Sequence, residues 1–123
     1  GMMVGHLQVP VIEPIGDLPS SLSRNVVYGL LTEELAFKGL IFTDALAMKG
    51  VAGNKSVCLQ ALQAGNDMVL APRRLKEEMD AVLEAVEKGE LPEEEINAKF
   101  LCCLPGNFMQ AFSICNRNNR KKN

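Results

Sequence analysis

The sequence has no tryptophan, one histidine and four cysteines among its 123 residues. The cysteines form no Cys-x-x-Cys pair, and His6 is remote in sequence from all of them, so neither a metal site nor a cofactor is expected. No apolar run approaches the roughly 18 residues that a membrane-spanning helix needs. A basic region followed by an apolar run is also missing at the N-terminus, so we expect no secretory signal and a cytoplasmic location by default. The cysteines are Cys58, Cys102, Cys103 and Cys115.

The sequence also lacks a large excess of charge of either sign. The formal net charge is -2, which points to neither a nucleic acid nor a membrane as partner. Only the last seven residues are strongly basic, and a short Asn-rich basic end is typical of a solvated tail. At the other end, Gly1 before Met2 indicates a remnant of tag removal, so the reading frame is expected to begin at one of the two methionines that follow.

Three continuous apolar segments predict short buried strands, and the length suits one domain with one core. Continuous rather than alternating apolar residues are typical of parallel strands that are covered on both faces. The segments are residues 2–7, 39–44 and 67–72.

Helical periodicity follows each of these strands. After a loop rich in proline, three serines offer N-caps for a helix over residues 22–35: Ser20, Ser21 and Ser23. Ser56 is expected to cap a second helix that Gly65 ends, residues 75–86 carry the most amphipathic stripe, and Gly89 ends that third helix. Pro92 suits the first turn of a further helix.

The resulting order, strand-helix three times and then a helix, predicts an α/β fold with a parallel sheet and right-handed crossovers. Beyond about residue 100 the apolar residues lose any firm period, and Pro105-Gly106-Asn107 interrupts them. We therefore expect residues 1–100 to form the domain and residues 101–123 to be a tail of unknown structure.

Polar groups follow each predicted strand, and in parallel α/β folds the functional groups gather at the C-terminal strand ends. His6 lies near the end of the first strand, Asp44 closes the second, and Arg73 with Arg74 follows the third. A carboxylate after an apolar strand must be hydrogen-bonded, capped or used in chemistry, and the pattern alone favours a structural cap. The two arginines are typical surface residues, and we assign them no role.

The segment Gly-Leu-Ile-Phe-Thr-Asp-Ala-Leu-Ala-Met-Lys-Gly-Val, residues 39–51, resembles the nucleophile segment of family 3 glycoside hydrolases. The stretch Met-Val-Gly-His-Leu-Gln-Val-Pro (3–10) is similar to the preceding barrel strand of that family. Downstream, residues 60–70 resemble the Ala-Gly-x-Asp-Met stretch that leads to its last strand. The similarity extends from about residue 3 to residue 98, and the β-N-acetylhexosaminidase branch is the most similar.

This resemblance implies three parallel βα units of a partial TIM-type (β/α)8 barrel, plus a C-terminal helix and a divergent tail. It also implies a retaining β-glycosidase acting on a carbohydrate substrate, with Asp44 as the catalytic nucleophile. His6 would contact the sugar, although a histidine satisfied by backbone near a strand end fits equally well. Met48 would form part of the subsite wall, with a core methionine as the alternative.

The departures from the family bear on activity. A barrel of this kind has eight βα units and about 250 residues, whereas this chain has three units. It lacks the Lys-His-Phe-Pro-Gly-His-Gly segment that carries the histidine acid/base, and it diverges after Lys99. We therefore expect a glycoside hydrolase fragment that is inactive alone, and a homo-oligomer because three strands leave unpaired edges. The alternative is a non-catalytic folded remnant that self-associates; no Gly-rich loop favours a phosphate-binding module.

Overall fold

The structure is a computed structural model, and it describes residues 1–14, 16–48 and 56–104. Strands and helices alternate along these residues as the sequence predicts. In chain order the elements are β1 (Met2–Val4), η1 (Ser20–Leu22), η2 (Asn25–Glu34), β2 (Ile41–Ala45), α1 (Val57–Ala64), β3 (Met68–Leu70), α2 (Leu75–Glu87) and α3 (Glu93–Cys103). The helix α3 crosses the expected boundary at residue 100, and the remaining tail, residues 105–123, lies outside the described residues.

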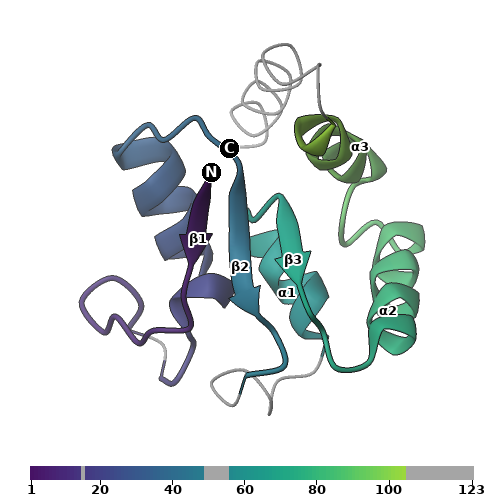
Figure 1. Ribbon diagram of the computed structural model, residues 1–123, viewed down its shortest axis with the longest axis horizontal. Helices are drawn as coiled ribbons and strands as arrows, with labels where there is room; N and C mark the ends of the chain where they lie inside the picture. Colours follow the sequence, from purple (N-terminus) through teal and green to yellow (C-terminus); the bar gives the residue numbers. More distant parts are fainter. Residues whose placement is uncertain (15, 49–55, 105–123) are drawn as a thin grey trace.

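The three strands form one parallel sheet in the order β1-β2-β3, so their C-terminal ends lie at the same edge (Figure 1). The helices η2 and α1 lie on one face of this sheet, while α2 and α3 lie beside β3 (Figure 1). Residues of β2 alternate between the two faces. Ile41 and Thr43 are buried on the helix side, whereas Phe42 and Asp44 belong to the other face and are only half-buried.

The core lies between the sheet and these helices in two clusters. The first cluster contains Val4, Val27, Leu31, Ile41 and Ala64. The second contains Leu22, Leu46, Val57, Cys58 and Ala61. Together they bury one face of the sheet, so the apolar strand segments are covered on one side where the sequence predicts two. On the other face Met3, paired with Phe42, is 54% exposed.

The strand β1 is shorter than expected, because the chain leaves the sheet at Gly5. The Ser20 hydroxyl donates to the Gly5 carbonyl at 2.6 Å and accepts from the Leu7 amide at 3.2 Å. Ser20 therefore holds the end of the strand rather than capping a helix. The expected cap at Ser56 is also wrong, since this residue has φ 52° and its side chain makes no capping bond. The Glu78 carboxylate accepts from the Cys58 amide at 3.0 Å in its place.

The segment that resembles Ala-Gly-x-Asp-Met has a clear structural explanation. Gly65 ends α1 with φ 120°, a backbone conformation that favours glycine, and this confirms the expected helix stop. Asn66 is fully buried and donates from its side chain to the carbonyls of Ser21 and Ala61 at 2.8 Å each. The Asp67 carboxylate then accepts from the Ile41 amide at 2.9 Å, which fixes where β2 enters the sheet.

The amphipathic stripe of α2 is only partly buried in the described structure, where Val82 packs against the second core cluster. Leu75, Met79 and Leu83 are 60%, 55% and 59% exposed, and Ala85 is the buried residue of this helix. Leu75, Met79 and Leu83 line an apolar groove of about 400 Å³ that is also bounded by Val69 of β3 and by Phe100 of α3. We call this the β3 groove. No helix within the described residues is long and apolar enough to span a membrane.

Candidate active site

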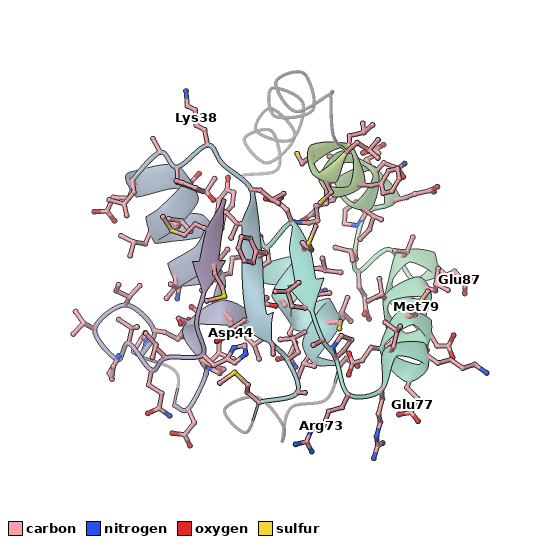
Figure 2. The ribbon with its side chains drawn as sticks, in the orientation of Figure 1. Lys38, Asp44, Arg73, Glu77, Met79 and Glu87 are labelled. Atoms are coloured by element: carbon pink, nitrogen blue, oxygen red, sulfur yellow. The ribbon has the colours of Figure 1, made fainter. Side chains whose placement is uncertain are left out.

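The expected site residues lie at one edge of the sheet. Asp44 lies at the arrowhead end of β2, and Arg73 lies at the same end in the loop after β3 (Figure 2). Lys38, which precedes β2, lies at the opposite end (Figure 2). His6 follows β1 and is hydrogen-bonded to Ala45, so it belongs to the edge that holds Asp44. The structure thus brings together the histidine and the carboxylate that the sequence singled out.

Asp44 occupies an irregular point of the sheet. The pairing of β2 with β3 runs from Phe42–Met68 to Ala45–Leu70, so β2 contains one extra residue there. The Thr43 hydroxyl fills the resulting gap by accepting from the Leu70 amide at 3.1 Å. Beyond this point the Asp44 Oδ1 atom accepts from the Ala45 amide at 2.7 Å. The carboxylate is therefore held in one orientation on the open face, and it stays half-exposed.

Both ring nitrogens of His6 are used inside the protein. Nδ1 lies 2.6 Å from the Ser21 hydroxyl, and Nε2 lies 3.0 Å from the Ala45 carbonyl oxygen. This arrangement favours the backbone-satisfied role over the sugar-contacting role. Contact between His6 and a sugar stays a prediction, and it would require one of these two bonds to break.

Met48 is 48% exposed and follows a tight turn in which its amide donates to the Ala45 carbonyl at 3.1 Å. Its exposure disfavours the alternative of a core methionine. A role in the subsite wall remains a prediction, and residues 49–55, which follow, lie outside the described residues.

Three residues of this edge were not assigned a site role from the sequence. Ser21 was expected to be a helix cap, but it is fully buried beside His6. Thr43 was considered only as the neighbour of Asp44. Arg73 donates from Nε to the Ala47 carbonyl at 3.1 Å, so it joins the loops after β2 and β3 although its side chain is on the surface. For Ser21, the one signal in the sequence was the run of three serines among residues 20–23.

The Asp44 carboxylate at this edge is half-exposed and held by a backbone amide. The described residues contain no cluster of three or more His, Cys, Asp or Glu side chains that could hold a metal ion. A carboxylate so placed can act as a nucleophile or as an electrostatic stabiliser of a developing positive charge.

Comparison with known proteins identifies the family of this chain. Residues 1–101 match the glycosyl hydrolase family 3 N terminal domain. β-Hexosaminidase LpqI of Mycobacterium bovis is 36% identical over an alignment of 102 residues that covers 75% of this chain and 26% of that protein. A β-hexosaminidase of Vibrio cholerae is 35% identical over 99 residues, covering 77% of this chain and 30% of its own length.

Solved structures give the same result. A glycoside hydrolase family 3 β-N-acetylglucosaminidase from a Paenibacillus species superposes with a TM-score of 0.73 at 34% identity, covering 91% of this chain and 22% of that one. The Mycobacterium tuberculosis LpqI structure gives a TM-score of 0.64 at 30% identity and covers 95% and 32%. The chain thus spans a fifth to a third of the lengths of these relatives. From the matched domain and from these relatives together, the chain is a member of glycosyl hydrolase family 3, with three parallel βα units of its partial barrel fold.

Proposed function

We propose that this chain is the nucleophile-bearing part of a retaining β-glycosidase, of the β-N-acetylhexosaminidase type, and that further βα units must complete it before it turns over substrate. The observation that carries the proposal is Asp44, which is held by the Ala45 amide on the uncovered face at the C-terminal strand edge. The names of the relatives support the sugar class, since they are β-hexosaminidases and a β-N-acetylglucosaminidase.

In this mechanism the Asp44 carboxylate attacks the anomeric carbon as the bond to the leaving oxygen breaks, and an ester between sugar and enzyme forms. A second group protonates the leaving oxygen and later removes a proton from the attacking water. His6 is the chain's only histidine, and both its ring nitrogens are already bonded. We therefore assign the acid/base to the units that complete the barrel.

A substrate whose leaving group needs no proton tests Asp44 directly. We expect a dinitrophenyl β-N-acetylglucosaminide to glycosylate the chain slowly once, detected as one sugar adduct by intact mass spectrometry and located at Asp44 by peptide mapping. Asp44→Asn should abolish the adduct, whereas Asp80→Asn, which changes an exposed aspartate of α2, should not. An adduct that persists in Asp44→Asn would contradict the assignment, as would its absence from the wild-type chain.

Ordinary aryl glycosides should not turn over on the chain alone. Rapid hydrolysis of a phenyl β-N-acetylglucosaminide that Asp44→Asn abolishes would show that the chain already contains an acid/base.

The second candidate function is a self-associating remnant without catalysis, and the β3 groove favours it. Leu75, Met79, Leu83 and Phe100 leave apolar surface beside β3, whose outer edge pairs with no strand in the part of the chain that the structure describes. Burying such a side chain is worth about 1.5–3 kcal/mol, so two copies that pair here would gain from covering it. The same surface would accept the missing barrel units, so a homo-oligomer and a completed barrel compete for one site.

Sedimentation equilibrium at micromolar concentration tests self-association. We expect a species heavier than the 13.4 kDa chain, and Leu83→Glu should return it to a monomer. Lys76→Glu on the polar part of α2 is the matched control and should leave the assembly intact. A wild-type chain that is a clean monomer would refute this candidate.

A further inference from the structure

The imidazole of His6 lies between two fixed partners, Ser21 and the Ala45 carbonyl. The Nδ1–Oγ distance is 2.6 Å, and the Nε2–O distance is 3.0 Å. A carbonyl oxygen can only accept a hydrogen bond, so Nε2 carries the proton. In the neutral ring Nδ1 is then an acceptor, and the Ser21 hydroxyl donates to it. The surroundings therefore select one tautomer.

Ser21 is itself held rigidly. It is fully buried, and its carbonyl accepts from the Asn66 side-chain amide at 2.8 Å. The backbone carbonyl of Asn66 in turn accepts from Lys99 Nζ at 2.7 Å, and the Lys99 side chain is 4% exposed. Buried polar contacts thus run from α3 through Asn66 to the backbone of Ser21, the residue whose hydroxyl orients the imidazole.

Ala45 connects these contacts to the carboxylate. Its carbonyl accepts from His6 and from the Met48 amide, and its own amide donates to Asp44 Oδ1 at 2.7 Å. The Leu46 amide, which shares a peptide group with the Ala45 carbonyl, donates to the Leu70 carbonyl at 2.9 Å, just beyond the extra residue in β2. His6 bonds to the carbonyl of the same peptide group, so this group is held both by β3 and by the segment that follows β1.

We propose that His6 is a positioning residue for Asp44: its Nε2–H, oriented by Ser21, holds the Ala45 carbonyl and, together with the Leu46–Leu70 bond, fixes the backbone at Ala45, whose amide donates to the carboxylate. The proposed function enters this inference only as the chemical role of the Asp44 carboxylate. The positioning of that carboxylate by His6 does not depend on any sugar. It gives His6 a role different from sugar contact, and it adds Ser21 to the residues on which the site depends.

Nuclear magnetic resonance of the full chain tests the proposal without a substrate. Since His6 is the only histidine, the long-range proton–nitrogen spectrum of its ring has no overlap. We expect the neutral ring to be the Nε2–H tautomer alone, and Ser21→Ala to yield a mixture of tautomers. A mixture in the wild-type chain would overturn the proposal.

Amide hydrogen exchange distinguishes positioning from general support of the fold. His6→Leu should speed exchange at Ala45 roughly fivefold to tenfold, the effect of losing one hydrogen bond. His6→Gln keeps a side-chain N–H that can reach the Ala45 carbonyl, and it should restore the wild-type rate. Exchange at Ile41, which Asp67 holds at the other end of β2, should not change. An equal increase at Ala45 and Ile41, or none at Ala45, would refute the role.

The same variants link the geometry to chemistry. Glycosylation of Asp44 by the dinitrophenyl glycoside should slow in His6→Leu and recover in His6→Gln, with the concentration dependence unchanged. An adduct rate that is equal in all three proteins would refute the role in catalysis. Absence of any adduct overturns the proposed function alone, because the tautomer and exchange measurements still decide the positioning. If His6→Leu does not fold, Ser21→Ala and His6→Gln keep both measurements available.

Discussion

Replacement of Thr43 by valine tests the irregular pairing that precedes Asp44. The Thr43 side chain is fully buried, and its hydroxyl is the acceptor for the Leu70 amide at 3.1 Å. Valine has nearly the same shape but no oxygen, so Thr43→Val leaves that amide without its acceptor at a point where the ladder is already irregular. A buried donor left unpaired costs about 1–3 kcal/mol.

The expected result is a lower free energy of unfolding, measured by urea denaturation with far-ultraviolet circular dichroism. With a slope of about 2 kcal/mol per molar urea, a loss of this size moves the midpoint by roughly 0.5–1.5 M. Thr43→Ser is the matched variant, because it keeps the hydroxyl and removes a methyl group worth about 0.8 kcal/mol. Stability alone does not separate the two variants, so the exchange rate of the Leu70 amide is the deciding measurement.

We expect the Leu70 amide to lose protection in Thr43→Val and to keep it in Thr43→Ser. Equal protection of this amide in Thr43→Val and in the wild-type chain would refute the reasoning, because the hydroxyl would then not be the acceptor that the irregular pairing needs.

Two further predictions concern buried groups away from the site. Burial, together with the charge of Glu78 and a hydrogen bond to it, raises the pKa of the Cys58 thiol from 9.0 to about 12. The unfolded chain then loses this proton first, so the contribution of Cys58 to stability is constant below pH 9 and falls between pH 9 and 12, by up to about 1.4 kcal/mol per pH unit. Denaturation curves at several pH values should show this slope in the wild-type chain and lack it in Cys58→Ala, and an equal slope in both would contradict it. Lys99→Met removes the donor to the Asn66 carbonyl and the partner 3.8 Å from Glu95, so we expect about 1–3 kcal/mol lower stability in urea, partly restored by adding Glu95→Gln. A Lys99→Met chain as stable as the wild type would show that the buried ammonium contributes nothing.

The sequence predicted those parts of the fold that depend on local pattern. The three strands, the helix stop at Gly65 and the position of Asp44 follow from apolar runs, from the conformational freedom of glycine and from the geometry of parallel strands. The resemblance to family 3 added the role of Asp44, which the pattern alone described better as a cap.

The remaining features depend on contacts between segments far apart in the sequence. Ser20 and Ser21 were expected to be helix caps, yet their hydroxyls bond to Gly5 and His6 because the loop after β1 returns to that strand. Ser56 failed as a cap because Glu78, twenty-two residues later, reaches the start of α1. Sequence spacing does not reveal such bonds, because they form only once the units have packed together.

The strand that precedes His6 is three residues long, and among the described residues it pairs with a strand on one side only. Short outer strands fray more readily than inner ones, since fewer bonds must break to open them locally. Each such opening would carry His6 away from the Ala45 carbonyl and leave the Asp44 carboxylate less well oriented. A strand bound along the outer side of β1 would suppress this fraying. It would therefore steady Asp44 without touching it, so the partner that completes the sheet would also improve the orientation of the proposed nucleophile.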